Sequence, residues 1–199
     1  YDENGRLTQM TNALGFSTSF EYDAMDRVVK VTDAKGNATT YTYDAVGNVS
    51  TETNAKGVTT SYVYDANYNL TSLTDAAGTS TYLYDAMDRV VGQTDRRGNT
   101  QWFRYDAIGR ITAVRDKNGN LTEYIYDGNG NIVKTIDALG TEAVFTYNKN
   151  DQLISMDLHR MDTVNNVDSH EITLYEYDGR NLVTKEINAL GDSTLYVYD

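Results

Sequence analysis

One repeat of the sequence reads YDAIGRITAVRDKNGNLTEYIYD, from Tyr105 to Asp127. It opens and closes on a Tyr-Asp pair, and this pair returns along the whole chain at intervals of 21, 21, 21, 20, 21, 21, 21, 30 and 21 residues. A fixed period of this length is the signature of a repeat architecture, in which each unit packs mainly on its neighbours. The pairs are Tyr1-Asp2, Tyr22-Asp23, Tyr43-Asp44, Tyr64-Asp65, Tyr84-Asp85, Tyr105-Asp106, Tyr126-Asp127, Tyr147-Asn148, Tyr177-Asp178 and Tyr198-Asp199.

Each repeat carries apolar residues at spacings typical of β-strands. An aromatic residue precedes every later Tyr of the pair by two positions, as Tyr124 precedes Tyr126, and an aliphatic residue follows the Tyr by six positions, as Ile111 follows Tyr105. Side chains two residues apart point to the same face of a strand. We therefore expect both aromatics of a repeat on one face, packed against rings of neighbouring strands, with sugar binding by stacked rings as the weaker alternative.

Two turn signals punctuate each repeat. The first runs from the Asp of the pair to a residue three positions later, and the second from Asp or Asn to a Gly three positions later. Asp or Asn at the first position can accept a backbone hydrogen bond, and Gly at the fourth tolerates positive φ. Gly36, Gly57 and Gly119 are such fourth positions of the second turn. In the first turn the Gly is replaced by Asp26, Tyr68, Asp88, Asp151 and Asn181.

The turn spacing predicts an all-β fold. About six residues separate successive turns, which is the usual length of a strand. Nine repeats of two antiparallel strands, spread over residues 1–199, would form a meander of about eighteen strands. An open sheet wider than about ten strands twists, so it curls, splits or closes. We expect an array of β-hairpins in a curved sheet, excised from a larger protein because the chain begins and ends inside the repeat.

Composition excludes several classes of partner and site. The chain has 17 Lys and Arg against 29 Asp and Glu, a net charge of −12, which argues against nucleic acid and anionic membrane surfaces. It has no Cys, so thiolate metal sites and disulfides are absent. The sequence contains no apolar run long enough to predict a membrane span. No Ser-His-Asp spacing, P-loop or dinucleotide glycine motif is present, so we expect no enzyme activity and no cofactor.

One repeat is longer than the others. The interval from Tyr147 to Tyr177 is 30 residues, and the additional residues, within 156–170, are expected to extend a hairpin beyond the wall. Loops that interrupt a regular scaffold are frequent functional positions. His159, Arg160 and His170 in this segment are therefore the candidate interaction residues.

The histidines also permit a metal hypothesis. His159 and His170 are the only histidines, and across an extended hairpin they could share a metal, with Asp157, Asp162 and Asp168 nearby. Because loop residues are commonly just solvated, we expect no metal. A zinc titration without heat would reject the metal hypothesis.

Two Asp-rich turns resemble the start of a calcium loop. They are Asp116–Asn120 and Asp127–Asn131, but the sixth position, which should be Gly, is Leu121 in one and Ile132 in the other. The preference of Asp for the first turn position already explains these carboxylates, so turn chemistry is the better interpretation.

The repeats resemble a known family. Asp2-Glu3-Asn4-Gly5-Arg6-Leu7, Asp23-Ala24-Met25-Asp26-Arg27-Val28 and Asp106-Ala107-Ile108-Gly109-Arg110-Ile111 are similar to the Tyr-Asp-x-x-Gly-Arg-Leu core of Rhs repeats, also called YD repeats. The family includes bacterial Rhs polymorphic toxins, C components of insecticidal toxin complexes, wall-associated proteins and teneurins. The resemblance implies a hollow shell of spiralling β-hairpins, secreted or at the cell surface, which in the toxins encloses a C-terminal toxin domain. The family's self-cleaving segment uses Pro, which this chain lacks, so that activity is not carried over.

The sequence therefore predicts a structural, non-catalytic role. The expected partners are an enclosed toxin domain and the rest of the shell, and the cut ends of the array should expose strand edges that can self-associate. The alternative is a surface module for adhesion or carbohydrate binding, in which the 156–170 segment contacts the partner.

Overall fold

The computed structural model describes residues 1–162 and 167–199. Side chains are described for all of these residues except 161, 162 and 167. The described residues form eighteen β-strands and no helix, which confirms the prediction of an all-β array of antiparallel hairpins. They contain no helix long and apolar enough to cross a membrane. The chain divides into two units, Tyr1–Thr100 and Gln101–Asp199.

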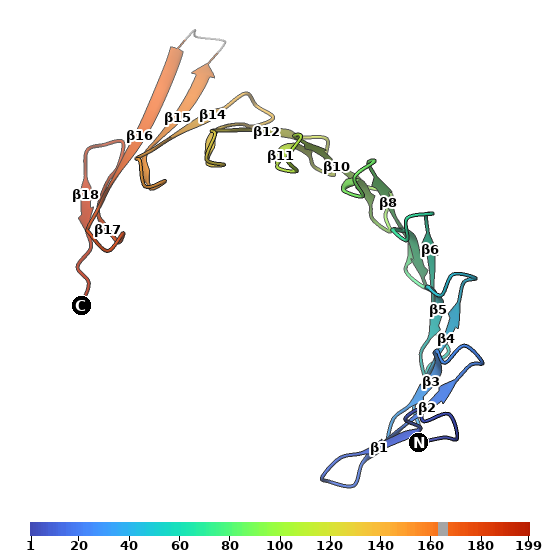
Figure 1. The fold of residues 1–199 in the computed structure, drawn as a ribbon. Coiled ribbons are helices and arrows are strands. Elements are labelled where there is room, and N and C mark those ends of the chain that lie inside the picture. The colour runs from blue at the N-terminus through green and yellow to red at the C-terminus, as the bar shows by residue number, and fades with distance from the viewer. Residues whose placement is uncertain (163–166) are drawn as a thin grey trace. The chain divides into compact units, whose positions relative to one another are not determined.

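The first unit is a meander in which each strand pairs antiparallel with the next in sequence. Within this unit the sheet is curved across its strands (Figure 1). Its strands are β1 (Gln9–Thr11), β2 (Ser17–Tyr22), β3 (Val28–Thr32), β4 (Ala38–Tyr43), β5 (Val49–Thr53), β6 (Thr59–Tyr64), β7 (Leu70–Asp75), β8 (Gly78–Tyr84) and β9 (Val90–Thr94).

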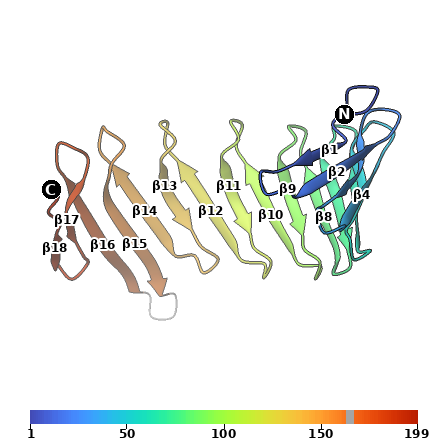
Figure 2. The same cartoon turned by 90° about the horizontal axis from the view of Figure 1, so that it is seen from below.

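The second unit repeats this topology, and its hairpin turns lie at the two ends of the strands (Figure 2). Its strands are β10 (Thr100–Tyr105), β11 (Ile111–Arg115), β12 (Leu121–Tyr126), β13 (Ile132–Ile136), β14 (Glu142–Tyr147), β15 (Leu153–Asp162), β16 (Val167–Tyr177), β17 (Val183–Ile187) and β18 (Ser193–Leu195).

The turns have the geometry that their residue spacing predicts. The amide of Gly36 donates to the carbonyl of Asp33 at 2.9 Å, and the amide of Asp33 donates to the carbonyl of Asn37, also at 2.9 Å. Gly36 has φ of +83°, the left-handed conformation that closes a hairpin loop of this kind. The turn after β7 is tighter, because Asp75 and Gly78 are directly paired. This tighter turn lies in the one repeat of 20 residues.

The five residues that replace Gly in the first turn adopt the same conformation as the Gly. Non-glycine residues with positive φ are uncommon, and Asn and Asp are the usual exceptions. Four of the five are Asp or Asn, and the fifth is aromatic. Their φ values are 62° at Asp26, 68° at Tyr68, 58° at Asp88, 59° at Asp151 and 66° at Asn181.

The sheet is a single layer with almost no core. Ala113, at 4% exposure, is the one buried hydrophobic residue of the part that the structure describes. The expected alternation is present: Tyr124 and Tyr126 are half-buried on one face, while Ile125 between them is 47% exposed on the other. Because little apolar area is buried, backbone ladders and the contacts between turns must supply much of the order.

One hairpin is longer than the rest, as the sequence predicts. β15 has 10 residues and β16 has 11, against 3 to 7 in the other strands. The hairpin extends past the ends of its neighbours β14 and β17 (Figure 2). His159 and His170 are paired directly within these two strands, so both belong to the extended hairpin.

Candidate functional site

The Asp of each Tyr-Asp pair organises its own turn. In the Asp106 turn, Oδ1 accepts the amides of Ile108 at 3.0 Å and Arg110 at 2.9 Å, while Oδ2 accepts Nε of Arg110 at 2.6 Å. The hydrogen bonds from the Arg110 side chain and amide hold the pKa of the Asp106 carboxyl below its usual value. The carboxylate therefore fixes both the turn and the direction of the Arg side chain.

The Arg side chain then reaches the turn of the next repeat. Nη1 of Arg110 donates to the carbonyl of Asp127 at 3.2 Å, and the guanidinium carbon lies 4.5 Å from the centre of the Tyr126 ring. A cation over an aromatic face within about 6 Å is attracted by the ring. Arg6 and Arg27 make the same pair of contacts to the repeats that follow them.

The Tyr of the pair has a second, polar contact. Its hydroxyl donates to the backbone carbonyl of the aliphatic residue that lies six positions after the preceding Tyr of the repeat, as Tyr126 does to Ile111 at 2.7 Å. This bond links the Tyr to the aliphatic position, the two most regular features of the repeat. The same bond is made by Tyr22 to Leu7, Tyr43 to Val28, Tyr84 to Leu70, Tyr147 to Ile132 and Tyr177 to Leu153.

Side chains of one turn also bind the left-handed residue of the next. Nδ2 of Asn131 donates to Oδ1 of Asp151 at 2.8 Å, and Nδ2 of Asn129 donates to the same oxygen at 2.8 Å. Four of the five non-glycine residues with positive φ are bound in this way. The further pairs are Arg6 with Asp26, Asn67 and Asn69 with Asp88, and Gln152 with Asn181.

The remaining predicted repeat residues take equivalent places. Asp44 and Asp65 hold the side chains of Asn48 and Asn69, at 3.0 and 3.2 Å, where other repeats have Arg. The corresponding Tyr residues end β4, β6 and β10, each followed by the Asp that opens the turn: Tyr43-Asp44, Tyr64-Asp65 and Tyr105-Asp106. Gly57 and Gly119 have φ of 76° and 91°. Arg stands four positions after the Asp in four repeats, at Arg6, Arg27, Arg89 and Arg110. This spacing is visible in the sequence, but it does not by itself predict a contact with the next repeat.

A second cluster lies on the long hairpin. In the register of the strands, Glu142 of β14 pairs with His159 of β15, and His159 pairs with His170 of β16. The two imidazole rings are stacked, with centroids 4.7 Å apart and planes inclined by 12°. Asp157 and Asp168, each two residues before a histidine, lie on the same face.

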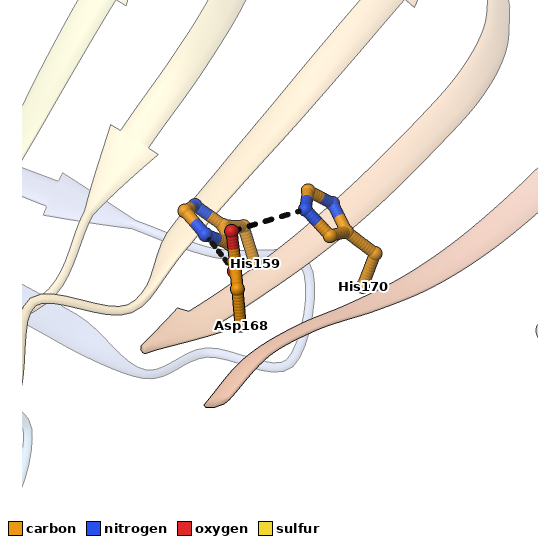
Figure 3. Close-up of side chains that lie close together, drawn as sticks. All are labelled: His159, Asp168 and His170. Atoms are coloured by element: carbon orange, nitrogen blue, oxygen red, sulfur yellow. Dashed lines mark ion pairs between the residues drawn. The ribbon is translucent and has the colours of Figure 1, made fainter. Parts of the chain in front are cut away.

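The imidazole nitrogens of this cluster face carboxylates. Nδ1 of His170 lies 2.8 Å from Oδ2 of Asp157, and its Nε2 lies 3.6 Å from Oδ2 of Asp168. Nε2 of His159 forms an ion pair with the other oxygen of Asp168, so the two rings point to one carboxylate (Figure 3). Hydrogen bonding to Asp157, followed by the charges of Asp157 and Asp168, raises the pKa of His170 above its usual value.

Not every residue singled out in the hairpin joins this cluster. Arg160 follows His159, so it belongs to the opposite face of β15, and it is exposed. Its carbonyl accepts the hydroxyl of Ser169 at 3.2 Å. Asp162 lies outside the described side chains. Glu142 joins the cluster from β14. No spacing in the sequence signals this residue, because it comes from a different hairpin.

The candidate calcium turns use their carboxylates internally. Oδ1 of Asp116 accepts the amides of Asn118 and Asn120 at 2.8 and 2.9 Å, and Oδ2 accepts Nδ2 of Asn120 at 2.9 Å. Asp127 makes the equivalent bonds with Asn129 and Asn131. Turn chemistry therefore accounts for these residues, as the sequence favoured.

The chain is similar to a known protein family and to several solved structures. The family model described as Teneurin YD-shell matches residues 1–199. A search of curated proteins found no match. Among solved structures, TcdB2-TccC3 aligns over 100% of this chain and 16% of its own, with 15% identity and a TM-score of 0.52, which shows a shared fold.

Two further solved structures align less closely. TcdB2-TccC3-TEV has 16% identity and a TM-score of 0.48, and the alignment covers 94% of this chain and 14% of the other. The Photorhabdus luminescens Tc holotoxin pore has 21% identity and a TM-score of 0.42, with 87% and 9% covered. The chain thus spans about a sixth or less of the length of these structures.

Proposed function

We propose that this chain, which belongs to the Teneurin YD-shell family, forms part of the wall of a hollow shell that encloses a toxin domain. The wall would act by steric enclosure, keeping the toxin from its targets and from proteases until release. The other partner would be the rest of the shell, and the parent protein would be secreted or displayed at the cell surface.

The observation that carries this proposal is the turn-to-turn network. Arg110 binds Asp106 of its own turn and the carbonyl of Asp127 in the next, and Arg6 and Arg27 fasten their repeats to the next ones in the same way. Such contacts can be continued indefinitely by adding repeats. Repeated contacts of this kind can build a long wall without a closed hydrophobic core.

The single-layer construction supports the same role. Only Ala113 among the described hydrophobic residues is buried, so the sheet presents both faces to its surroundings. Apolar side chains such as Val63 (56% exposed) and Leu83 (53% exposed) stand on the face opposite the aromatics in the first unit. A wall with two accessible faces can contact a cargo on one side and solvent on the other.

We propose no catalytic step for this segment. Its recurring Asp side chains are engaged in turns, as Asp106 and Asp116 are, and these bonds fix backbone geometry. The residues of the Tyr-Asp pairs and the Gly residues at the fourth turn positions would act by holding the wall.

Protease protection tests the enclosure directly. The full-length protein containing residues 1–199 is treated with a protease that cleaves the isolated toxin domain, and cleavage of the toxin is followed over time. We expect the enclosed toxin to survive at protease levels that degrade the isolated domain. Equal cleavage rates of the toxin in the two samples would refute enclosure.

The protruding hairpin favours a second candidate function, adhesion or carbohydrate binding. β15 and β16 extend beyond their neighbours, and Ile172 and Leu174 of β16 are 43% and 42% exposed. A glycan array probed with residues 1–199 tests this alternative. A dose-dependent signal that is lost when residues 158–171 are replaced by a short turn would favour it over enclosure.

A further inference from the structure

We propose that His159, Asp168 and His170 form a zinc site on the β15–β16 hairpin. The three side chains would supply two imidazole nitrogens and one carboxylate oxygen, and water would take the fourth position. Zinc sites with three protein ligands and one open position are well known among His and carboxylate ligand sets. This inference is independent of whether the wall encloses a toxin.

The strand register brings the ligands together. His159 and His170 are directly opposite in the antiparallel ladder, and Asp168 is two residues from His170 on the same strand face. The three side chains therefore leave the hairpin on the same side, and no rearrangement of the backbone is needed to converge them. Figure 3 shows the carboxylate of Asp168 facing both rings.

The spacing of the ligand atoms suits one small cation. One ligand atom from each residue lies within 4.8 Å of those from the other two. Around a zinc ion with bonds of about 2.0–2.2 Å, tetrahedral ligand atoms lie roughly 3.3–3.6 Å apart. Asp168 and His170 have side chains 47% and 49% exposed, so small rotations can close the difference.

The carboxylates beside the two Nδ1 atoms are placed as metal-binding histidines require. Nδ1 of His170 faces Asp157 at 2.8 Å, and Nδ1 of His159 faces Oε2 of Glu142 at 3.7 Å. A carboxylate on one ring nitrogen orients the imidazole and makes the other nitrogen a better ligand. In both rings this leaves Nε2 directed at Asp168.

One nitrogen of the cluster lacks a hydrogen-bond partner. Nε2 of His159 is shielded from solvent and forms no hydrogen bond with any described residue. A carboxylate oxygen of Asp168 faces the same nitrogen as an ion pair. A polar atom shielded in this way is costly unless it is satisfied, and a metal ion would satisfy it.

The ligand types select the metal. Imidazole with carboxylate suits zinc and related transition metals, whereas Ca²⁺ and Mg²⁺ prefer all-oxygen sites. Three carboxylates, Asp157, Asp168 and Glu142, surround the two rings, and one cation, Lys134, lies 2.6 Å from Glu142. The surplus of negative charge favours a dication. Bound zinc would join β15 to β16 across the long hairpin.

Calorimetry combined with imidazole NMR tests the site. Residues 1–199 are titrated with ZnCl₂, while the ¹⁵N signals of the two histidines are followed. We expect one zinc per chain, with both Nε2 resonances shifted and the melting temperature raised by zinc. CaCl₂ at the same concentrations should produce neither effect. No heat and no histidine shift at millimolar zinc would overturn the proposal.

Matched variants localise the binding. His159→Gln, His170→Gln and Asp168→Asn should each weaken zinc binding at least tenfold, and Asp157→Asn by about 10–100-fold through the orientation of His170. Glu171→Gln is the control, because Glu171 is exposed on the opposite face of β16 and should leave binding unchanged. Circular dichroism without metal verifies that each variant is folded. Zinc binding unchanged in folded His159→Gln and His170→Gln would also overturn the site.

Discussion

The hydroxyl of Tyr126 donates a hydrogen bond of 2.7 Å to the carbonyl of Ile111, fifteen residues earlier in the chain. The bond crosses from the end of β12 to the start of β11. The guanidinium of Arg110 lies over the ring of the same Tyr126 side chain. One side chain thus contacts a backbone carbonyl through its polar end and a cation through its face. In a sheet with almost no core, contacts of this kind are a main source of order.

Tyr126→Phe should therefore destabilise the array while keeping the ring. Loss of one partly buried hydrogen bond costs about 1 kcal/mol, which lowers the melting temperature of a chain of this size by about 2–4 °C. Tyr68→Phe is the matched control, because Tyr68 is 61% exposed. Equal melting temperatures of Tyr126→Phe and Tyr68→Phe would show that the Tyr126 hydroxyl contributes nothing.

Gly36→Val tests the left-handed turn position. A Cβ at Gly36 would meet no atom within 4 Å, so any cost comes from the φ of +83°. A left-handed backbone costs a non-glycine residue about 1–2 kcal/mol, and Asn less than Val. Urea unfolding should rank stability as wild type, then Gly36→Asn, then Gly36→Val. Unchanged stability of Gly36→Val would contradict the turn assignment.

Acid should weaken the array. The hydrogen bonds from the Asn37 side chain and amide lower the pKa of Asp33, and Asn120 does the same for Asp116. A carboxyl with a lowered folded pKa contributes stability above its unfolded value, near 3.9, and loses it as pH falls through the folded pKa. Urea unfolding should therefore give a free energy of unfolding that falls as pH drops below about 4.

The double variant Asp33→Asn with Asp116→Asn isolates this pH effect. Asn keeps the oxygen that accepts the turn amides, as Asn54 does at 3.0 and 3.1 Å, but it does not titrate. The variant should lose less stability than the wild type between pH 7 and pH 3. An identical pH dependence of the two proteins would mean that these carboxyls are not linked to unfolding.

The isolated segment should associate through its terminal strands. All three residues of β18 are exposed, and the strand pairs with β17 on one side. Unpaired strand edges associate, and Lys on an edge opposes this. Sedimentation velocity should show mass rising with concentration, and Leu195→Lys should suppress the rise. Leu190→Lys is the control, since Leu190 is 87% exposed but lies in the turn. A monomer at all concentrations would contradict the prediction.

The regular part of the fold was predictable because its signals are local. A turn needs Asp or Asn at the first position and a residue tolerant of positive φ at the fourth, and Asp33 and Gly36 meet both demands within four residues. The alternation of Tyr124, Ile125 and Tyr126 likewise follows from the period of a strand. The extended hairpin followed from the one interval of 30 residues.

The contacts between repeats were harder to predict. The bond from Tyr126 ends on a backbone carbonyl, which no residue type signals. The link from Asn131 to Asp151 joins two turns whose proximity depends on the strand register. The histidine cluster depends on two strand registers. The register of β15 with β16 pairs His159 with His170, and the register of β14 with β15 pairs Glu142 with His159. A shift of one residue would move either partner to the other face.

Electron microscopy of the full-length protein that contains residues 1–199 tests the central claim most directly. The account predicts a closed, hollow shell whose wall has the single-layer hairpin repeat, with density for a toxin domain inside. An open sheet, or a solid particle with nothing enclosed, would contradict it.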